Sequence, residues 1–227
     1  MYYFLTASAD TYITENSPGH IVLYPDSITK NHGGDEILEL KKVFTNEYST
    51  NPNNVSRILV KFNYTQLSQS INDGFIPRVD THILSSSAFL KLYEVEGQTE
   101  LDKTYSLATN MLRRDWDEGT GKHFDNPQTT TGCNWESGST AKWASTETGM
   151  TSGSRPGSGG GVWITAANTQ ASQSFTNQSG DINTDVTDLV NKHLEGAYPN
   201  YGFITKFSGS YESDNNPFNL KFFSRNT

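Results

Sequence analysis

The sequence predicts an all-β protein: an antiparallel β-sandwich of the jelly-roll type, with long loops and one short helix. Three observations lead to this class. Apolar and polar residues alternate in short stretches along the chain, Gly, Asn, Pro and Ser gather between these stretches, and Phe and Tyr dominate an aromatic content of 12%. Alternation with a period of two indicates half-buried strands, and frequent turn residues indicate a sandwich or barrel. The 227 residues are expected to form one domain, 1–227, because sandwiches of this length are common.

The first half of the chain contains five predicted strands, at residues 9–13, 37–40, 57–62, 85–93 and 105–111. The clearest is 57–62, in which apolar and β-branched residues stand beside two charges, Arg57 and Lys61. In the fourth strand, Leu90 and Leu92 alternate with Lys91 and Tyr93, so one set is expected to face the core.

The second half contains strands at 162–165, 172–175, 202–207 and 220–225, and the one predicted helix at 185–196. Leu189, Val190 and Leu194 fall on one helical face. Thr187 is predicted to be the N-cap, and Gly196 stands where a glycine commonly follows a helix.

Between these halves lies a segment of about 122–161 that is rich in Gly, Ser and Trp and has little periodicity. It is predicted to be one long surface excursion. A loop of this length in a compact domain is usually functional or ordered by a partner. A flexible linker is the alternative for its glycine-rich tip, 152–161.

Composition limits where the chain works and what it binds. Cys133 is the only cysteine, so no disulfide forms within the chain. The first six residues, MYYFLT, lack the basic and apolar regions of a signal peptide, and no apolar run approaches the ~20 residues that cross a bilayer. We therefore expect no membrane span and synthesis in the cytoplasm. The net charge of −8 argues against binding to nucleic acid.

Motifs for catalysis are not found in the sequence. There is no nucleophile elbow, zinc-protease motif or phosphate-binding loop. Cys133 has no basic sequence neighbour to lower its pKa, so it is expected to be a buried small hydrophobe. The histidines show no metal-ligand spacing; they are His20, His32, His82, His123 and His193. We therefore expect no catalytic residues and no cofactor.

Calcium is the one cofactor that the sequence leaves open, with Asp115 and Asp117 as weak candidate ligands. Two aspartates at this spacing can turn hard oxygens toward one cation. The next ligand position holds Gly119, so the EF-hand pattern fails. A turn in which the aspartates accept hydrogen bonds from backbone amides is the favoured alternative.

Tryptophans in or beside the long excursion are candidates for carbohydrate binding. Exposed indoles stack on sugar rings, and nearby polar groups bond the hydroxyls; the residues concerned are Trp116, Trp135, Trp143, Glu118, Asn134 and Glu136. The alternative is that the indoles anchor the loop to the sandwich, since each can bury ~200 Å². We favour anchoring for Trp116 and Trp135, and both interpretations stay open for Trp143.

Several short motifs, taken in order, resemble a known family. They are ADTYI at 9–13, RILVKF at 57–62, WDEGTG at 116–121, TTGCNW at 130–135, DVT at 185–187 and NYGFI at 200–204. Together they span nearly the whole chain and resemble the DNRLRE-type β-sandwich family, which is also classed among carbohydrate-binding modules. A closer resemblance, including KFFSR at 221–225, is to structural proteins of tailed marine bacteriophages that carry this domain. The name-giving motif is absent, and such proteins commonly continue past the point that corresponds to Thr227.

The resemblance implies a non-catalytic virion structural protein that serves as capsid decoration, collar, tail or fibre-associated subunit. Its partners would be other virion proteins and copies of itself. The alternative is a carbohydrate-binding module for host-surface or environmental polysaccharide. A depolymerase is the weakest option, because no acid and base pair can be named.

Overall fold

A computed structural model describes residues 2–15, 27–43, 54–77, 86–96, 100–143, 150–152 and 159–227. Within these ranges the chain forms eleven strands, two α-helices and two short 3-10 helices, which confirms the predicted all-β class. The strands are β1 (Ala9–Thr14), β2 (Ile37–Val43), β3 (Asn54–Lys61), β4 (Phe89–Leu92), β5 (Glu100–Met111), β6 (Met150–Ser152), β7 (Val162–Ile164), β8 (Gln170–Gln178), β9 (Ile182–Asp185), β10 (Phe203–Phe207) and β11 (Phe218–Phe223).

One layer of the sandwich is an antiparallel sheet in the order β1-β3-β10-β5-β8. Strand β3 lies inside it, with Ile58 opposite both Tyr12 of β1 and Thr205 of β10. A strand covered on both faces is expected to be apolar along its whole length, which fits the predicted strand at 57–62.

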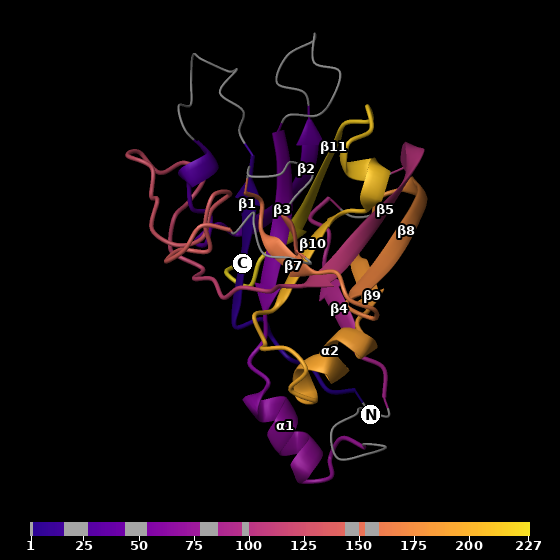
Figure 1. Cartoon of the computed structure of the whole chain (residues 1–227). Helices are drawn as coiled ribbons and strands as arrows, with labels where there is room; N and C mark the ends of the chain where they lie inside the picture. The colour runs from indigo at the N-terminus through magenta and orange to yellow at the C-terminus, as the bar shows by residue number, and fades with distance from the viewer. Residues whose placement is uncertain are drawn as a thin grey trace.

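The other layer contains the pairs β2–β11 and β4–β9. The residues after β4 join the two pairs, since the Phe223 N–H donates to the Tyr93 carbonyl (3.0 Å). Lys42 and Val43 of β2 also pair with the start of β3, so the first sheet curls over into the second layer. Figure 1 shows the sandwich with its two α-helices at one end.

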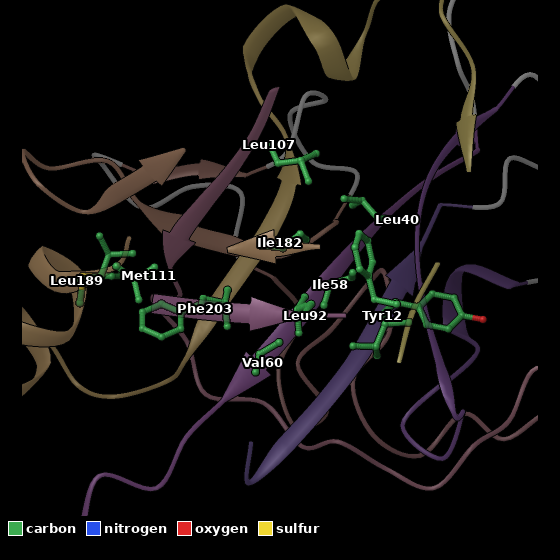
Figure 2. Close-up of a cluster of buried hydrophobic side chains, with 14 of the residues drawn as sticks. Tyr12, Leu40, Ile58, Val60, Leu92, Leu107, Met111, Ile182, Leu189 and Phe203 are labelled. Atoms are coloured by element: carbon green, nitrogen blue, oxygen red, sulfur yellow. The ribbon is translucent and has the colours of Figure 1, made fainter. Parts of the chain in front are cut away.

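The main hydrophobic core lies between these layers. In Figure 2, Tyr12, Ile58 and Val60 come from one sheet, and Leu92 and Ile182 come from the other. All five are buried. Ile58 and Val60 are two positions apart in β3 and face the same core, as the period of two in the sequence predicts.

A second hydrophobic cluster covers the outer face of the first sheet. Leu59 and Ile204 point away from the main core and pack under side chains from the segment 112–163. Trp135, Trp143 and Cys133 are among these covering side chains. In the described part of the predicted excursion many residues are exposed, while its apolar side chains fasten it to the sheet as a third layer. We call the described residues of 112–163 the loop layer; in Figure 1 it lies beside β1 and away from β8.

Two α-helices close one end of the sandwich (Figure 1): α1 (Thr65–Asn72) and α2 (Thr187–Leu194). Helix α1 was not predicted from the sequence, and it buries only Leu67 and Ile71. The predicted Thr187 N-cap is wrong, since Thr187 is the first helical residue and its N–H donates to the Asp185 carboxylate (3.0 Å).

Asn31 ties the loop layer together from a fully buried position. Its side-chain amide donates to the carbonyls of Glu118 (2.7 Å) and Cys133 (2.8 Å). Its oxygen accepts from the N–H groups of Gly33 (3.1 Å) and Gly121 (2.8 Å). A Cβ at Gly121 would lie 2.4 Å from the Asn31 carbonyl oxygen, so only glycine permits this approach.

Arg57 carries the main polar contact under the loop layer. It lies on the outer face of β3 and is fully buried, although the sequence suggested a flanking charge. Its guanidinium makes a two-pronged ion pair with Glu212 (2.9 and 3.0 Å) and donates to the Gly160 carbonyl. The ring centroids of Trp135 and Trp163 lie 4.8 and 5.3 Å, respectively, from the Arg57 Cζ atom. A planar guanidinium can both pair with a carboxylate through two hydrogen bonds and lie over an aromatic ring.

Lys206 completes this buried ionic cluster. Its ammonium lies 3.8 Å from the Glu212 carboxylate and 5.1 Å from the Trp163 ring. Burial would raise the pKa of Glu212, but Arg57 and Lys206 outweigh it and hold that pKa below its ordinary value. Glu212 is therefore ionised and its charge is matched inside the protein.

We expect Arg57→Met and Glu212→Gln each to lower the free energy of unfolding by about 3–5 kcal/mol, because each breaks the two-pronged ion pair and leaves the charges of the buried cluster unbalanced. The double variant should lose less than the sum of the single losses. Urea unfolding followed by circular dichroism measures all three. Lys221→Met, which removes an exposed pair with Glu96, is the control and should cost less than about 1 kcal/mol. Additive losses at Arg57 and Glu212 would contradict the predicted coupling.

Candidate binding site at the helical end

The tryptophans predicted to contact sugar are buried. Trp116, Trp135 and Trp143 are 4%, 3% and 4% exposed, so their faces are not presented for stacking in this structure. The Trp116 indole N–H donates to the Tyr201 carbonyl (2.8 Å), and that of Trp143 donates to the Asn134 carbonyl (2.9 Å). All three anchor the loop layer, as favoured for Trp116 and Trp135.

The polar residues predicted beside them also hold the chain together. Glu118 accepts from the Asp10 N–H (2.9 Å) and forms a two-pronged ion pair with Arg225. Asn134 accepts from the N–H groups of Glu136 (2.9 Å) and Ser137 (3.0 Å), which is a local turn.

The two aspartates considered for calcium take part in different contacts. Asp115 pairs with the Lys61 ammonium and accepts from the Trp116 N–H (3.0 Å). The Asp117 backbone donates to the Gly138 carbonyl (3.0 Å) and accepts from the Cys133 N–H (2.7 Å). Within the described ranges, no group of three or more His, Cys, Asp and Glu side chains could hold a metal ion.

Cys133 is completely buried, and this burial raises the pKa of its thiol, so the thiolate is disfavoured. His32 stacks on Tyr12 with ring centroids 4.2 Å apart, and His123 lies 6.1 Å from His32. His20 and His82 lie outside the described residues.

A groove of about 740 Å³ opens at the helical end, beside α1. The end of β3, the chain before α1 and the loop before β10 bring its walls together. Amide and hydroxyl side chains predominate, joined by one ammonium and two aromatic rings: Asn63, Gln69, Asn72, Asn200, Ser8, Thr65, Ser68, Lys61, Phe62 and Tyr64. Such side chains both donate and accept hydrogen bonds, which suits a neutral polar ligand.

Local hydrogen bonds fix the shape of this groove. Asn200 donates to the Phe62 carbonyl (2.8 Å) and accepts from the Gly202 N–H (3.2 Å), so it holds its loop against the end of β3. Asn63 accepts from the Thr65 N–H (2.9 Å) at the start of α1. Two walls of the groove are therefore set by side chains that also line it.

Exposed aromatic side chains belong to two segments that contact Ser70 of α1. Tyr2, Phe4 and Phe75 are 90%, 81% and 67% exposed. Tyr3 accepts a hydrogen bond from the Ser70 hydroxyl of α1 (3.2 Å), and the Phe75 N–H donates to the Ser70 carbonyl (2.9 Å), so Tyr3 and Phe75 both contact Ser70. We call Tyr2, Tyr3, Phe4 and Phe75 the aromatic surface.

Buried polar atoms lie behind the groove. His193 of α2 stacks on Phe203, with ring centroids 5.5 Å apart, and contacts Tyr64, which lines the groove. Both ring nitrogens of His193 and the Tyr64 hydroxyl are buried with no hydrogen-bond partner in the described part of the chain. Burial lowers the pKa of His193 to about 4, so its ring is neutral near pH 7.

No family model matches the chain, and no curated protein does. In the described residues, no helix combines the length and apolar character needed to cross a bilayer.

We expect the stability of the protein to fall as the pH drops from 6.5 toward 4, in part through His193. The folded protein has a His193 pKa of about 4 and the unfolded chain one near 6.5, so the unfolded chain binds more protons in this window. His193→Phe, which retains an aromatic ring, should remove roughly 3 kcal/mol of this loss. Urea unfolding of both proteins at several pH values measures the difference, in which the contribution of His32 cancels. If the free energies of unfolding of the wild type and His193→Phe fall in parallel from pH 7 to 4, His193 does not contribute to the loss.

Proposed function

We propose that this chain is a non-catalytic structural subunit of a tailed bacteriophage virion, and that it acts through contacts with other virion proteins. The aromatic surface is the observation that carries this proposal. Large apolar side chains clustered at a protein surface mark interaction sites, whereas single exposed ones are common. Aromatic side chains are enriched in protein interfaces.

The remainder of the structure supports a role as a building block. Arg57 of β3 donates to the Gly160 carbonyl and Glu118 accepts from the Asp10 N–H of β1, so both fasten the loop layer to the sheet. A rigid scaffold reduces the entropy lost on assembly. The ordered motifs that resemble phage structural proteins support the virion as the location, as capsid decoration, collar, tail or fibre-associated subunit.

Quantitative mass spectrometry of gradient-purified particles tests the virion role. We expect a reproducible copy number relative to the major capsid protein: hundreds of copies for a decoration protein, or a few rings of copies for a collar or fibre subunit. Absence of the protein from the particles would overturn the proposal.

The double variant Tyr2→Ser/Phe4→Ser tests the aromatic surface itself. Truncating a residue central to an interface costs about 2 kcal/mol or more, or about 30-fold in affinity. We therefore expect far fewer copies per particle, with unchanged folding by circular dichroism. Phe124→Ser is the matched control, since Phe124 is 88% exposed and packs against His123 instead. Equal incorporation of the two variants would show that the aromatic surface makes no virion contact.

Polysaccharide binding is the second candidate function, and the polar groove is the observation that favours it. Amide and hydroxyl groups around a pocket match the hydroxyl groups of a sugar, and an aromatic wall can cover a sugar face. This site differs from the tryptophan site expected from the sequence.

Affinity electrophoresis against a panel of polysaccharides, with and without calcium, tests this candidate. If the chain is retarded, Ser68→Tyr should abolish the retardation by filling the groove. Gln66→Tyr is the control, because Gln66 lies on α1, is exposed and does not line the groove. Unretarded wild-type protein on all polysaccharides, or equal retardation of both variants, would contradict binding in the groove.

A further inference from the structure

Strand β8 is the edge of the first sheet. One side of β8 pairs with β5, and no strand in the described ranges pairs with its other side. Figure 1 shows β8 at the margin of the molecule opposite the loop layer. The opposite edge strand, β1, is buried, and Glu118 accepts its Asp10 N–H. The two edges of the sheet therefore differ: one is covered and the other is open.

Apart from an irregularity at its C-terminal end, where the register with β5 shifts between Glu100 and Thr104, the open edge lacks the features that usually prevent strand pairing. Its nine residues, QASQSFTNQ, include no charge and no proline. Natural edge strands are commonly protected by charged side chains, proline or bulges, because unpaired backbone groups recruit another strand. The neutrality of β8 stands out in a chain that carries a net charge of −8.

The side chains of β8 repeat symmetrically about Ser174. Ser172, Ser174 and Thr176 are exposed on the outer face, and the exposed residues Gln170 and Gln178 stand at the two ends of the strand, so the order is Gln170, Ser172, Ser174, Thr176 and Gln178. Read in either direction, this order is amide, hydroxyl, hydroxyl, hydroxyl, amide. On the inner face Phe175 enters the main core, and Gln173 accepts from the Asn183 N–H (2.7 Å), so both are held in place.

We propose that β8 pairs antiparallel with β8 of a second copy of this chain, about a two-fold axis at Ser174. Ser174 then faces its own symmetry mate, and Ser172 faces Thr176. Opposed hydroxyls can each donate and accept, and such cross-strand pairs stabilise antiparallel sheets. A two-fold contact needs one self-complementary patch, and a strand with a symmetric side-chain order supplies it.

The length of the pairing sets its strength. Asn177 has a left-handed backbone (φ 55°), so the regular ladder is confined to Ser172–Thr176 and its symmetry mate. An interface of this size lies at the weak end of specific contacts. We therefore expect a dimer that forms at high micromolar concentration, and more fully where copies are held close together. The pairing involves β8 alone and does not depend on the virion role.

Sedimentation velocity of the purified chain, at concentrations up to about 0.5 mM, tests the pairing. This range suits a weak dimer, since a dissociation constant of 1 mM corresponds to a binding free energy of only about 4 kcal/mol. The wild type should sediment increasingly as a dimer as concentration rises. Ser174→Lys and Ser174→Glu should each stay monomeric, because the axis brings two like charges together. An equal mixture of the two variants should form a heterodimer, because the charges are then opposite.

The control is Thr104→Lys, which adds the same charge on the outer face of β5, opposite Thr176 and one strand away from the edge. It should dimerise like the wild type. Wild-type protein that stays monomeric throughout would overturn the proposal. Dimers that survive Ser174→Lys would place the contact elsewhere, for instance on the aromatic surface. Since the purified chain is used, either result is independent of whether the protein is found in particles.

Discussion

The ion pair between Arg57 and Glu212 is the constraint on which the arrangement of layers depends. A guanidinium in the middle of a central strand, on the outer face of the sheet, is stable there only if it is both paired and covered. Glu212 pairs it, and Trp135, Trp163 and Gly160 of the loop layer cover it. The loop layer is therefore a structural requirement of β3, and the molecule has three layers where a simple sandwich has two.

Local pattern was sufficient to predict most strands, because the period of two survives wherever one face of a strand meets the main core. Local pattern was insufficient where a residue distant in the sequence determines whether a side chain is buried. Arg57 has the sequence context of a solvated charge, and only Glu212, 155 residues away, makes its burial possible. Thr187 has the chemistry of an N-cap, but Asp185 bonds its N–H. Helix α1 buries only two apolar side chains, which is a weak helical signal.

The candidate site was less predictable than the fold. Ser8, Asn63 and Asn200 line one groove although they are far apart in the sequence, and none belongs to a recognisable motif. The tryptophans were the visible signal, and they proved to be anchors because each indole fills space between the loop layer and the sheet. The aromatic run at Tyr2–Phe4 was visible in the sequence too, but its exposure depends on where α1 places it.

The distribution of tryptophan has a practical consequence for spectroscopy. All four indoles belong to the cluster under the loop layer, and the cluster between the sheets contains none within the described residues. Intrinsic fluorescence excited at the indole band therefore reports on the attachment of the loop layer, while far-ultraviolet dichroism reports on the sheets. The chain thus carries a built-in optical probe of one layer. A partner that loosened or tightened the loop layer would change the tryptophan emission without altering the far-ultraviolet circular dichroism of the sheets.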